Sequence, residues 1–298
     1  MTDLVIETSN LRKQYGDIAA LRGLTMQVPK GSIFGFLGRN GAGKTTTIKV
    51  LLGMARPSSG VARAFGTALD TAEASLALRR RTGFVSEDKE LYDYMTIDEI
   101  VRFTASFYPR WRRDLEEQYL QKFDLPRTRR IKGLSRGMRA KVALLLALAR
   151  GAELLILDEP TSGLDPAATE EVLQALVSHV AHEELTVFFS SHQIAEVEQV
   201  TDRVAIIDHG AAVVSGAIDD LRERYCRIQL VFAGDAPAHT FRAPGVVRAR
   251  RQGRVLTILS SAGPDSVVDE ARGLHPSAVD TTPVTLKDIF LETVVNED

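Results

Sequence analysis

The sequence has a single cysteine, Cys226, and no apolar run longer than the eight residues of 142–149. One cysteine cannot form a disulfide within the chain, which excludes a disulfide-stabilised scaffold and suits a reducing compartment. A membrane-spanning helix needs about 20 apolar residues, so we expect no span here. The opening residues, MTDLVIETSN, lack a basic region followed by an apolar stretch, so we also expect no secretory signal. If the protein works at a membrane, another chain must supply the span.

The chain also carries little net charge. Its 37 lysines and arginines stand against 39 aspartates and glutamates, which leaves a formal charge of −2. A nearly neutral chain creates no global field for nucleic acid or an acidic membrane surface, so we expect no nucleic-acid partner. Hydrophobic residues make up 44% of the 298 positions, enough to bury a core, which excludes a disordered chain. The length allows about two domains of about 150 residues each.

Strand and helix patterns alternate along most of the chain. Apolar patterns predict strands at 4–7, 23–28, 33–37, 154–157, 186–189, 204–207 and 211–215, and helices at 45–53, 167–182 and 194–201. This alternation predicts an α/β fold with a mostly parallel sheet and helices on both faces. Residues from about 90 to 135 carry apolar positions at helical spacing, which predicts an inserted helical subdomain.

The pattern changes near residue 217. The segment 218–298 is richer in arginine and contains the breaks Ala236-Pro237, Pro244-Gly245 and Gly263-Pro264. Short strands are expected at 227–232 and 255–259, and helices near Val267 and Leu286. We therefore expect two unequal domains, 1–217 and a small α+β domain at 218–298.

The most specific motif is a glycine-rich run, Gly38-Arg39-Asn40-Gly41-Ala42-Gly43-Lys44-Thr45, which fits the pattern G-x-x-x-x-G-K-[ST]. Glycines let backbone N–H groups curl around phosphate oxygens, and the following helix points its positive end at the same anion. Lys44 would contact the β- and γ-phosphates, and the Thr45 hydroxyl would ligate Mg2+. The other interpretation, a plain glycine turn, does not explain the apolar strand before the run and the helix after it.

A second motif joins the apolar strand 154–157 to Asp158, Glu159 and Pro160. A carboxylate in this position lies at the carboxyl edge of the sheet, where ligands of open α/β folds bind. Asp158 would hold Mg2+ through water, and Glu159 would be the general base or water-orienting residue for attack on the γ-phosphate. An Asp-Glu pair after a strand is common, so it indicates nucleotide hydrolysis only because the same chain also has the phosphate loop. Together the two motifs predict nucleotide hydrolysis.

Further motifs follow in a fixed order, and with them the chain resembles the ATP-binding-cassette (ABC) ATPases over residues 4–217. The landmarks are Walker A (38–45), the Gln-loop region (near 87), the signature Leu134-Ser135-Arg136-Gly137-Met138, Walker B (154–158), the D-loop Ser162-Gly163-Leu164-Asp165 and the switch histidine, His192. The resemblance implies a P-loop NTPase cassette: a mostly parallel sheet core with an antiparallel β subdomain and an inserted helical subdomain. It also implies ATP and Mg2+ as cofactors.

The resemblance implies a role for each matching residue. The nucleotide would be bound by Tyr15, Gly38, Asn40, Gly41, Ala42, Gly43, Lys44, Thr45 and Thr46, while Ser135 and Gly137 would close on the nucleotide of a partner subunit. Tyr15 would stack on adenine, although a tyrosine packed under a loop is the other interpretation. His192 would contact the γ-phosphate, or would cap the helix that follows it. Asp165 would link the two sites of a dimer, or would be an N-cap or turn before Pro166.

Three residues depart from the family pattern. Arg136 stands where the signature usually has glycine, and Met138 where it has glutamine. Glu87 stands where the Gln-loop normally has glutamine. An anionic Glu87 would join Thr45 and Asp158 around Mg2+ and would be a catalytic residue together with Glu159 and His192. These departures leave ATP binding intact and affect the expected rate of hydrolysis and its regulation.

The signature helix, Glu87 and the ending Thr285–Thr293 are similar to those of bacterial exporter-type cassettes. The resemblance implies an ATPase that drives export through a separate integral membrane permease. Because the chain has one cassette, it would need a second one, identical or different. It would be cytoplasmic and peripheral on the inner face of the membrane. The ending has a second interpretation, an amphipathic helix that packs on its own domain through Leu286, Ile289, Phe290 and Val294.

Two other functions stay open, both without transport. One is a regulatory, immunity or sensor ATPase that engages a membrane partner. The other, an ATPase acting on ribosomes or nucleic acid, is less favoured because the chain has one cassette, no heptads and one cysteine.

The segment after Glu87 is rich in aromatic residues and has local basic clusters. A solvated face is the default interpretation of the basic clusters. The sharper hypothesis is a groove next to Glu87 that docks a short cytoplasmic helix of the membrane subunit. Its lining would come from Tyr92, Tyr94, Phe103, Phe107, Tyr108 and Trp111.

Overall fold

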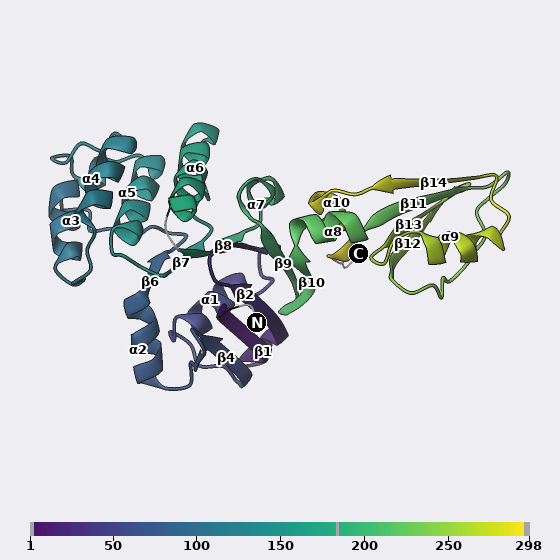
Figure 1. Ribbon diagram of the computed structural model, residues 1–298, viewed down its shortest axis with the longest axis horizontal. Coiled ribbons are helices and arrows are strands. Elements are labelled where there is room, and N and C mark those ends of the chain that lie inside the picture. The colour runs from purple at the N-terminus through teal and green to yellow at the C-terminus, as the bar shows by residue number, and fades with distance from the viewer. Residues whose placement is uncertain (1–2, 183–184, 295–298) are drawn as a thin grey trace.

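The computed structural model describes residues 3–182 and 185–294 and contains three sheets (Figure 1). The central sheet has six strands in the order β10-β9-β3-β8-β7-β6. Their bounds are β3 (Ile33–Leu37), β6 (Thr82–Val85), β7 (Leu154–Asp158), β8 (Thr186–Ser191), β9 (Arg203–Asp208) and β10 (Ala211–Ala217). The pairs β6-β7, β7-β8, β8-β3 and β3-β9 are parallel, and β10 is antiparallel to β9. The predicted mostly parallel sheet is confirmed.

Strand β3 explains why this sheet is covered on both faces. All its residues are buried, and their side chains alternate between two cores. Phe34 and Phe36 belong to a core shared with α1 (Lys44–Leu51), whereas Ile33 and Leu37 belong to a core shared with the helices on the opposite face. Alternate residues of a strand point to opposite faces, so a run without polar positions requires cover on both.

The second sheet is antiparallel and covers the α1 face of the molecule. Its order is β2-β1-β4-β5, with β1 (Leu4–Tyr15), β2 (Ile18–Pro29), β4 (Ser59–Ala64) and β5 (Thr67–Ala68). The antiparallel β subdomain is thus confirmed. The strands expected at 4–7 and 23–28 were too short, because both hairpin strands continue through polar, exposed positions that carry no apolar signal. Helix α2 (Ala72–Arg81), which follows, was not expected.

The chain between β6 and β7 forms the inserted helical part. It contains α3 (Ile97–Ala105), α4 (Arg113–Lys122), the 3-10 turn η1 (Ile131–Gly133) and α5 (Arg136–Leu148). A capping box joins Thr96 and Glu99 at the start of α3, which fixes where that helix begins. Helices α6 (Pro166–His182) and α7 (Ile194–Val200) complete this face of the central sheet. The subdomain bounds of 90–135 stay a prediction.

The third sheet lies at the far end of the molecule from α3 and α4 (Figure 1). Helix α8 (Ile218–Arg224) leads into it, and its strand order is β12-β13-β11-β14. The bounds are β11 (Cys226–Val231), β12 (Val246–Gln252), β13 (Val255–Ser260) and β14 (Ala278–Pro283), with α9 (Asp265–Arg272) packed on one face. The α+β character of this region is confirmed, although β12 and β14 were not expected.

The last helix, α10 (Leu286–Thr293), returns to the cassette. Ile289 and Phe290 are buried in the same core as Val197 of α7. The Leu286 amide donates to the carboxylate of Glu198, 3.1 Å away. The predicted amphipathic helix is confirmed, because Leu286, Ile289, Phe290 and Val294 are buried, and the helix contacts α7 as well as α8 and β12. The domain boundary at residue 217 stays a prediction. Among the described residues, no helix is long and apolar enough to cross a membrane.

Candidate active site

The glycine-rich loop joins the end of β3 to the first turn of α1. Gly43, with φ +109°, immediately precedes α1, and a Cβ added there would lie 2.8 Å from the carbonyl oxygen of Ala20. A Cβ at Gly38 would lie 2.7 Å from the Ile207 carbonyl oxygen. Gly41 has φ +84° but faces open space. The loop therefore needs glycine for close backbone approach at two positions and for its left-handed turn at a third.

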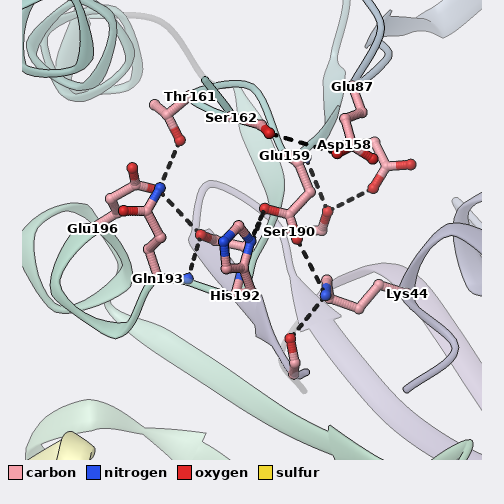
Figure 2. Close-up of polar contacts among 12 residues, drawn as sticks. Lys44, Glu87, Asp158, Glu159, Thr161, Ser162, Ser190, His192, Gln193 and Glu196 are labelled. Carbon is pink, nitrogen blue, oxygen red and sulfur yellow. Dashed lines mark hydrogen bonds and ion pairs between the residues drawn. The ribbon is translucent and has the colours of Figure 1, made fainter. Parts of the chain in front are cut away.

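Lys44 lies over this loop with only 6% of its side chain exposed. Its Nζ donates to the carbonyl oxygens of Gly38 at 2.8 Å and Arg39 at 3.2 Å. It also forms an ion pair with Oε1 of Glu159 at 3.1 Å. The loop, the lysine and the carboxylate after β7 thus meet at one point, as Figure 2 shows.

Glu159 is the centre of the polar contacts in Figure 2. Its Oε2 lies 2.7 Å from Nδ1 of His192. Because an ionised carboxylate can only accept, this contact requires the proton on Nδ1 of His192. The backbone at Glu159 is left-handed, with φ +47°, and its amide donates to the carbonyl oxygen of Ser190. The side chain is therefore held from both oxygens, and its backbone is fixed to β8.

Asp158 and Ser190 face each other where β7 and β8 end. They are paired in the strand register, and Ser190 Oγ donates to Asp158 Oδ1 at 2.8 Å. Both side chains are buried. Asp158 keeps its second carboxylate oxygen outside this hydrogen bond, so the residue can still serve as a ligand.

A buried network missed from the sequence anchors the loop after Glu159. Glu196 on α7 accepts from Thr161 Oγ1 at 2.7 Å and from Ser191 Oγ at 3.0 Å. Ser191 Oγ in turn accepts from the Gln193 amide. The only signal in the sequence was a glutamate on the apolar face of a short helix. Helix α7 begins after Gln193 without a side-chain cap hydrogen bond, so the capping role considered for His192 was wrong.

A cavity of 480 Å³ opens beside the loop. Of the predicted residues, it is lined by Asn40, Gly41, Gly43, Lys44, Thr45, Thr46, Glu87 and Glu159. Gly38, Ala42, Asp158 and His192 are not among its lining residues. Arg22 and His209 also line it, and no motif in the sequence pointed to them.

Tyr15 lies outside this cavity lining, at the end of β1. It is 45% exposed, and Nζ of Lys13 lies 4.6 Å from the centre of its ring. The interpretation that Tyr15 is packed beneath a loop was therefore wrong. An exposed ring leaves the stacking role as a prediction.

The signature residues lie away from this cavity. Ser135 caps α5, because its Oγ accepts from the Met138 amide at 3.2 Å. Gly137 is buried, and a Cβ there would lie 3.0 Å from that of Ala168 on α6. Arg136 instead lines a separate 300 Å³ hollow, which it shares with Glu87. Within one chain, the signature residues Ser135 and Gly137 therefore do not lie at the phosphate loop.

Asp165 has the capping role considered for it. Its Oδ1 accepts from the Ala168 amide at 2.9 Å, with Pro166 as the first residue of α6. Proline suits this position because it lacks the amide that the first turn would leave unpaired. The link to a second site stays a prediction.

A groove of 610 Å³ follows Glu87 along the helical part. It is lined by the segment 88–93 together with Ile100, Thr104, Arg139 and Leu146. Of the aromatic residues predicted to line it, Tyr92 does, whereas Tyr94, Phe103 and Phe107 are not among the lining residues. These four side chains are exposed and form a run of ring contacts from Tyr94 through Tyr92 and Phe103 to Phe107. The inclusion of Trp111 in this groove was wrong: it is not among the lining residues but packs against the main core, and its Nε1 donates to Glu116 of α4 at 2.7 Å. Tyr108 also does not line this groove, because its ring stacks on Arg150.

These features define a P-loop nucleotide hydrolase: a phosphate loop that precedes a helix, a buried acidic pair at the end of a parallel strand, and a histidine that contacts the second of those acids.

Comparison with known proteins narrows the class. A family model described as ABC transporter matches residues 21–162. The chain is 36% identical over 225 residues to a bacitracin transport ATP-binding protein of Enterococcus faecalis, covering 74% of this chain and 72% of that protein. It is 32% identical to the Nod factor export ATP-binding protein I of Sinorhizobium fredii, covering 97% and 86%.

Solved structures agree with this assignment. An ATP-binding subunit of an ABC transporter is 29% identical and superposes with a TM-score of 0.66 over 74% of this chain and 92% of that one. A dimeric bacterial ABC transporter cassette, 22% identical with a TM-score of 0.64 over 71% and 98%, shares the fold. The chain belongs to the ABC transporter ATP-binding proteins and is an ATP-hydrolysing subunit of that family.

Proposed function

We propose that this chain powers export through a membrane permease, with Glu159 as the base for ATP hydrolysis. The observation that carries the proposal is the position of Glu159, only 5% exposed, between Lys44 and His192 at the phosphate cavity. A general base must lie within hydrogen-bond reach of the water it activates and must be oriented by its neighbours. The name of the bacitracin relative supports a role in transport, and the name of the Nod factor relative supports export as its direction.

On this proposal, the ion pair between Lys44 and Glu159 belongs to the state without nucleotide. A γ-phosphate entering the cavity competes for the Lys44 ammonium, because phosphate carries more charge than a carboxylate. Lys44 then turns to the phosphate, and Glu159 keeps its contact with His192. The attacking water passes its proton to the freed Glu159 carboxylate as its oxygen bonds to the γ-phosphorus and the bond to the β-phosphate oxygen breaks.

The donor set fits Mg2+. Thr45 offers a hydroxyl, and Asp158 and Glu87 offer carboxylates, the hard oxygen ligands that Mg2+ takes together with phosphate oxygens and water. When bound, Mg2+ would neutralise charge that develops on the phosphates. Glu87 adds a negative charge where the family usually has a neutral amide, which favours a tighter hold on the cation.

A second cassette completes the site on this proposal. Ser135 and Gly137 line no part of their own chain's phosphate cavity, so a partner subunit is needed for them to reach a nucleotide. The dimeric cassette of the same fold supports this arrangement. Both an identical partner and a different cassette meet the requirement.

The groove beside Glu87 is the proposed dock for a cytoplasmic helix of the permease. Its exposed aromatic rim and its acidic and basic lining residues suit a short amphipathic helix. The chain would then be held on the inner face of the membrane by its permease. The domain bounds of 1–217 for the cassette and 218–298 for the accessory region are part of the same proposal.

The proposal is tested by recovering the Glu159→Gln protein from membranes with ATP present. We expect it to form an ATP-dependent dimer that brings down a membrane protein, and Tyr92→Ala in the same background to dimerise without the membrane protein. A protein that stays monomeric with ATP, or a dimer that recovers no membrane protein, would contradict the proposal.

A further inference from the structure

A buried lysine connects the segment after β6 to the residue after β7. Lys89 is only 7% exposed, although it carries an ammonium group. Its Nζ donates to the carbonyl oxygen of Glu87 at 2.9 Å and to that of Glu159 at 3.4 Å. Burial lowers the pKa of Lys89, and the nearby carboxylates of Glu87, Asp88 and Glu159 oppose that shift. A buried ammonium is kept only where such partners compensate for the lost water.

Both ends of this contact have unusual backbone conformations. Lys89 has φ +48° and Glu159 has φ +47°, in the left-handed region that non-glycine residues rarely adopt. Such conformations persist only where the surroundings hold them. The Glu159 amide is held by Ser190, and its carbonyl oxygen is held by the Ser162 amide and by Lys89. Of these three contacts, the one from Lys89 comes from a segment other than β8 and the loop after β7.

The position of Lys89 joins two hollows. It lines the 300 Å³ hollow with Glu87, Arg136 and Ser162, and it also lines the 610 Å³ groove. The next residues along the chain, Glu90 to Asp93, form one wall of that groove. A displacement of this wall therefore moves Lys89 directly, and the far end of its side chain contacts the Glu159 backbone.

We propose that Lys89 is a positioning residue for ATP hydrolysis, which fixes the Glu159 backbone and passes movements of the groove wall to it. The inference rests on the proposed role of Glu159 as the base. In the sequence, Lys89 follows Glu87, the acidic departure from the family pattern, and its ammonium compensates for that charge. The groove wall and the backbone of Glu159 are thus joined through the Lys89 side chain.

The test uses the full chain with Lys89→Met, which keeps the side-chain length but removes the charge and the donors. We expect kcat to fall about tenfold or more, because a misplacement of about 1 Å can cost about 100-fold. The KM for ATP and the affinity for a non-hydrolysable ATP analogue should stay within about threefold of the wild type, since Lys89 lies outside the phosphate cavity lining. Lys132→Met is the matched control, because Lys132 is exposed on η1 and should keep full activity.

A double-mutant cycle separates this role from a general effect on the fold. In a Glu159→Gln background, adding Lys89→Met should leave the residual hydrolysis unchanged, because the positioned carboxylate is already gone. If Lys89→Met does not fold, Lys89→Gln takes its place with the same expected and contrary results. An unchanged kcat in the single variant, an equal loss of analogue affinity, or a further additive loss in the double variant would overturn the proposal. Wild-type hydrolysis by Glu159→Gln alone would instead overturn the role of Glu159.

Discussion

At the scale of single residues, the site depends on where backbone atoms approach one another. The phosphate-loop motif predicted which residues line the cavity, because its pattern encodes a turn that only glycine can make at fixed positions. The contacts behind the cavity were not predictable. Glu196, Thr161 and Ser191 come from three separate segments, and only the parallel pairing of β7 and β8 brings them together. A local sequence pattern cannot predict a contact between residues that are this far apart in the chain.

The two loop glycines provide a matched pair of substitutions. Gly43→Ala places a Cβ 2.8 Å from a backbone oxygen at φ +109°, whereas Gly41→Ala meets only a left-handed φ in open space. We expect Gly43→Ala to weaken ATP-analogue binding about tenfold or more, because the loop must move away from its phosphate-binding shape. Gly41→Ala should cost only strain of about 1 kcal/mol. Titration with a fluorescent ATP analogue measures both, and equal effects would contradict the clash at Gly43.

At the scale of elements, most buried strands were predicted well, whereas β6 and the exposed strands were missed or misjudged in length. The five residues of β3 match the expected range of 33–37 because every position is apolar. Strand β12 carries arginines at 248, 250 and 251, and β14 reads AVDTTP, so neither has an apolar alternation. Both are edge strands of the third sheet, where one partner strand is enough and polar residues are tolerated. Both strands form because they pair with β13 and β11, although their own sequences have no strand pattern.

The N-terminus of α10 offers a test at this scale. Thr285 and Asp288 form a capping box, and Asp288 also pairs with Arg227 at 2.6 Å. Thr285→Ala should lower the free energy of unfolding by about 1 kcal/mol, because the first turn loses a partner for its amide. Urea denaturation measures the change. Thr281→Ala, at an exposed position of β14, is the control and should have little effect; a similar loss in both variants would contradict the capping role.

At the scale of the whole molecule, the chain is elongated, with the third sheet joined to the cassette through α8 and α10 (Figure 1). The third sheet has its own core, formed by β11, β13 and α9. Helix α10, by contrast, belongs to the main core with α7. Composition predicted a second region after residue 217 but not this return, because the apolar face of a helix does not reveal which neighbour it covers. The cassette and the C-terminal region are therefore expected to unfold together.

Ile289 tests this connection between the two regions. Its side chain is fully buried in the core that α10 shares with α7, whereas Leu291 on the same helix is exposed. Ile289→Ala should lower the free energy of unfolding by about 2–4 kcal/mol, and Leu291→Ala should change it by less than about 0.5 kcal/mol. Calorimetry should show one transition that moves as a unit. A separate low-temperature transition in Ile289→Ala, with the rest unmoved, would contradict the shared core.

The central claim is that Glu159, held by Lys44 and His192, is the base for ATP hydrolysis. The most direct test is the steady-state rate of ATP hydrolysis by Glu159→Gln, with Glu73→Gln on the exposed face of α2 as the control. The account predicts a rate lower by about 100-fold to 10,000-fold, the usual contribution of a general base, with ATP binding retained and the control unchanged. Hydrolysis by Glu159→Gln at the wild-type rate would contradict it.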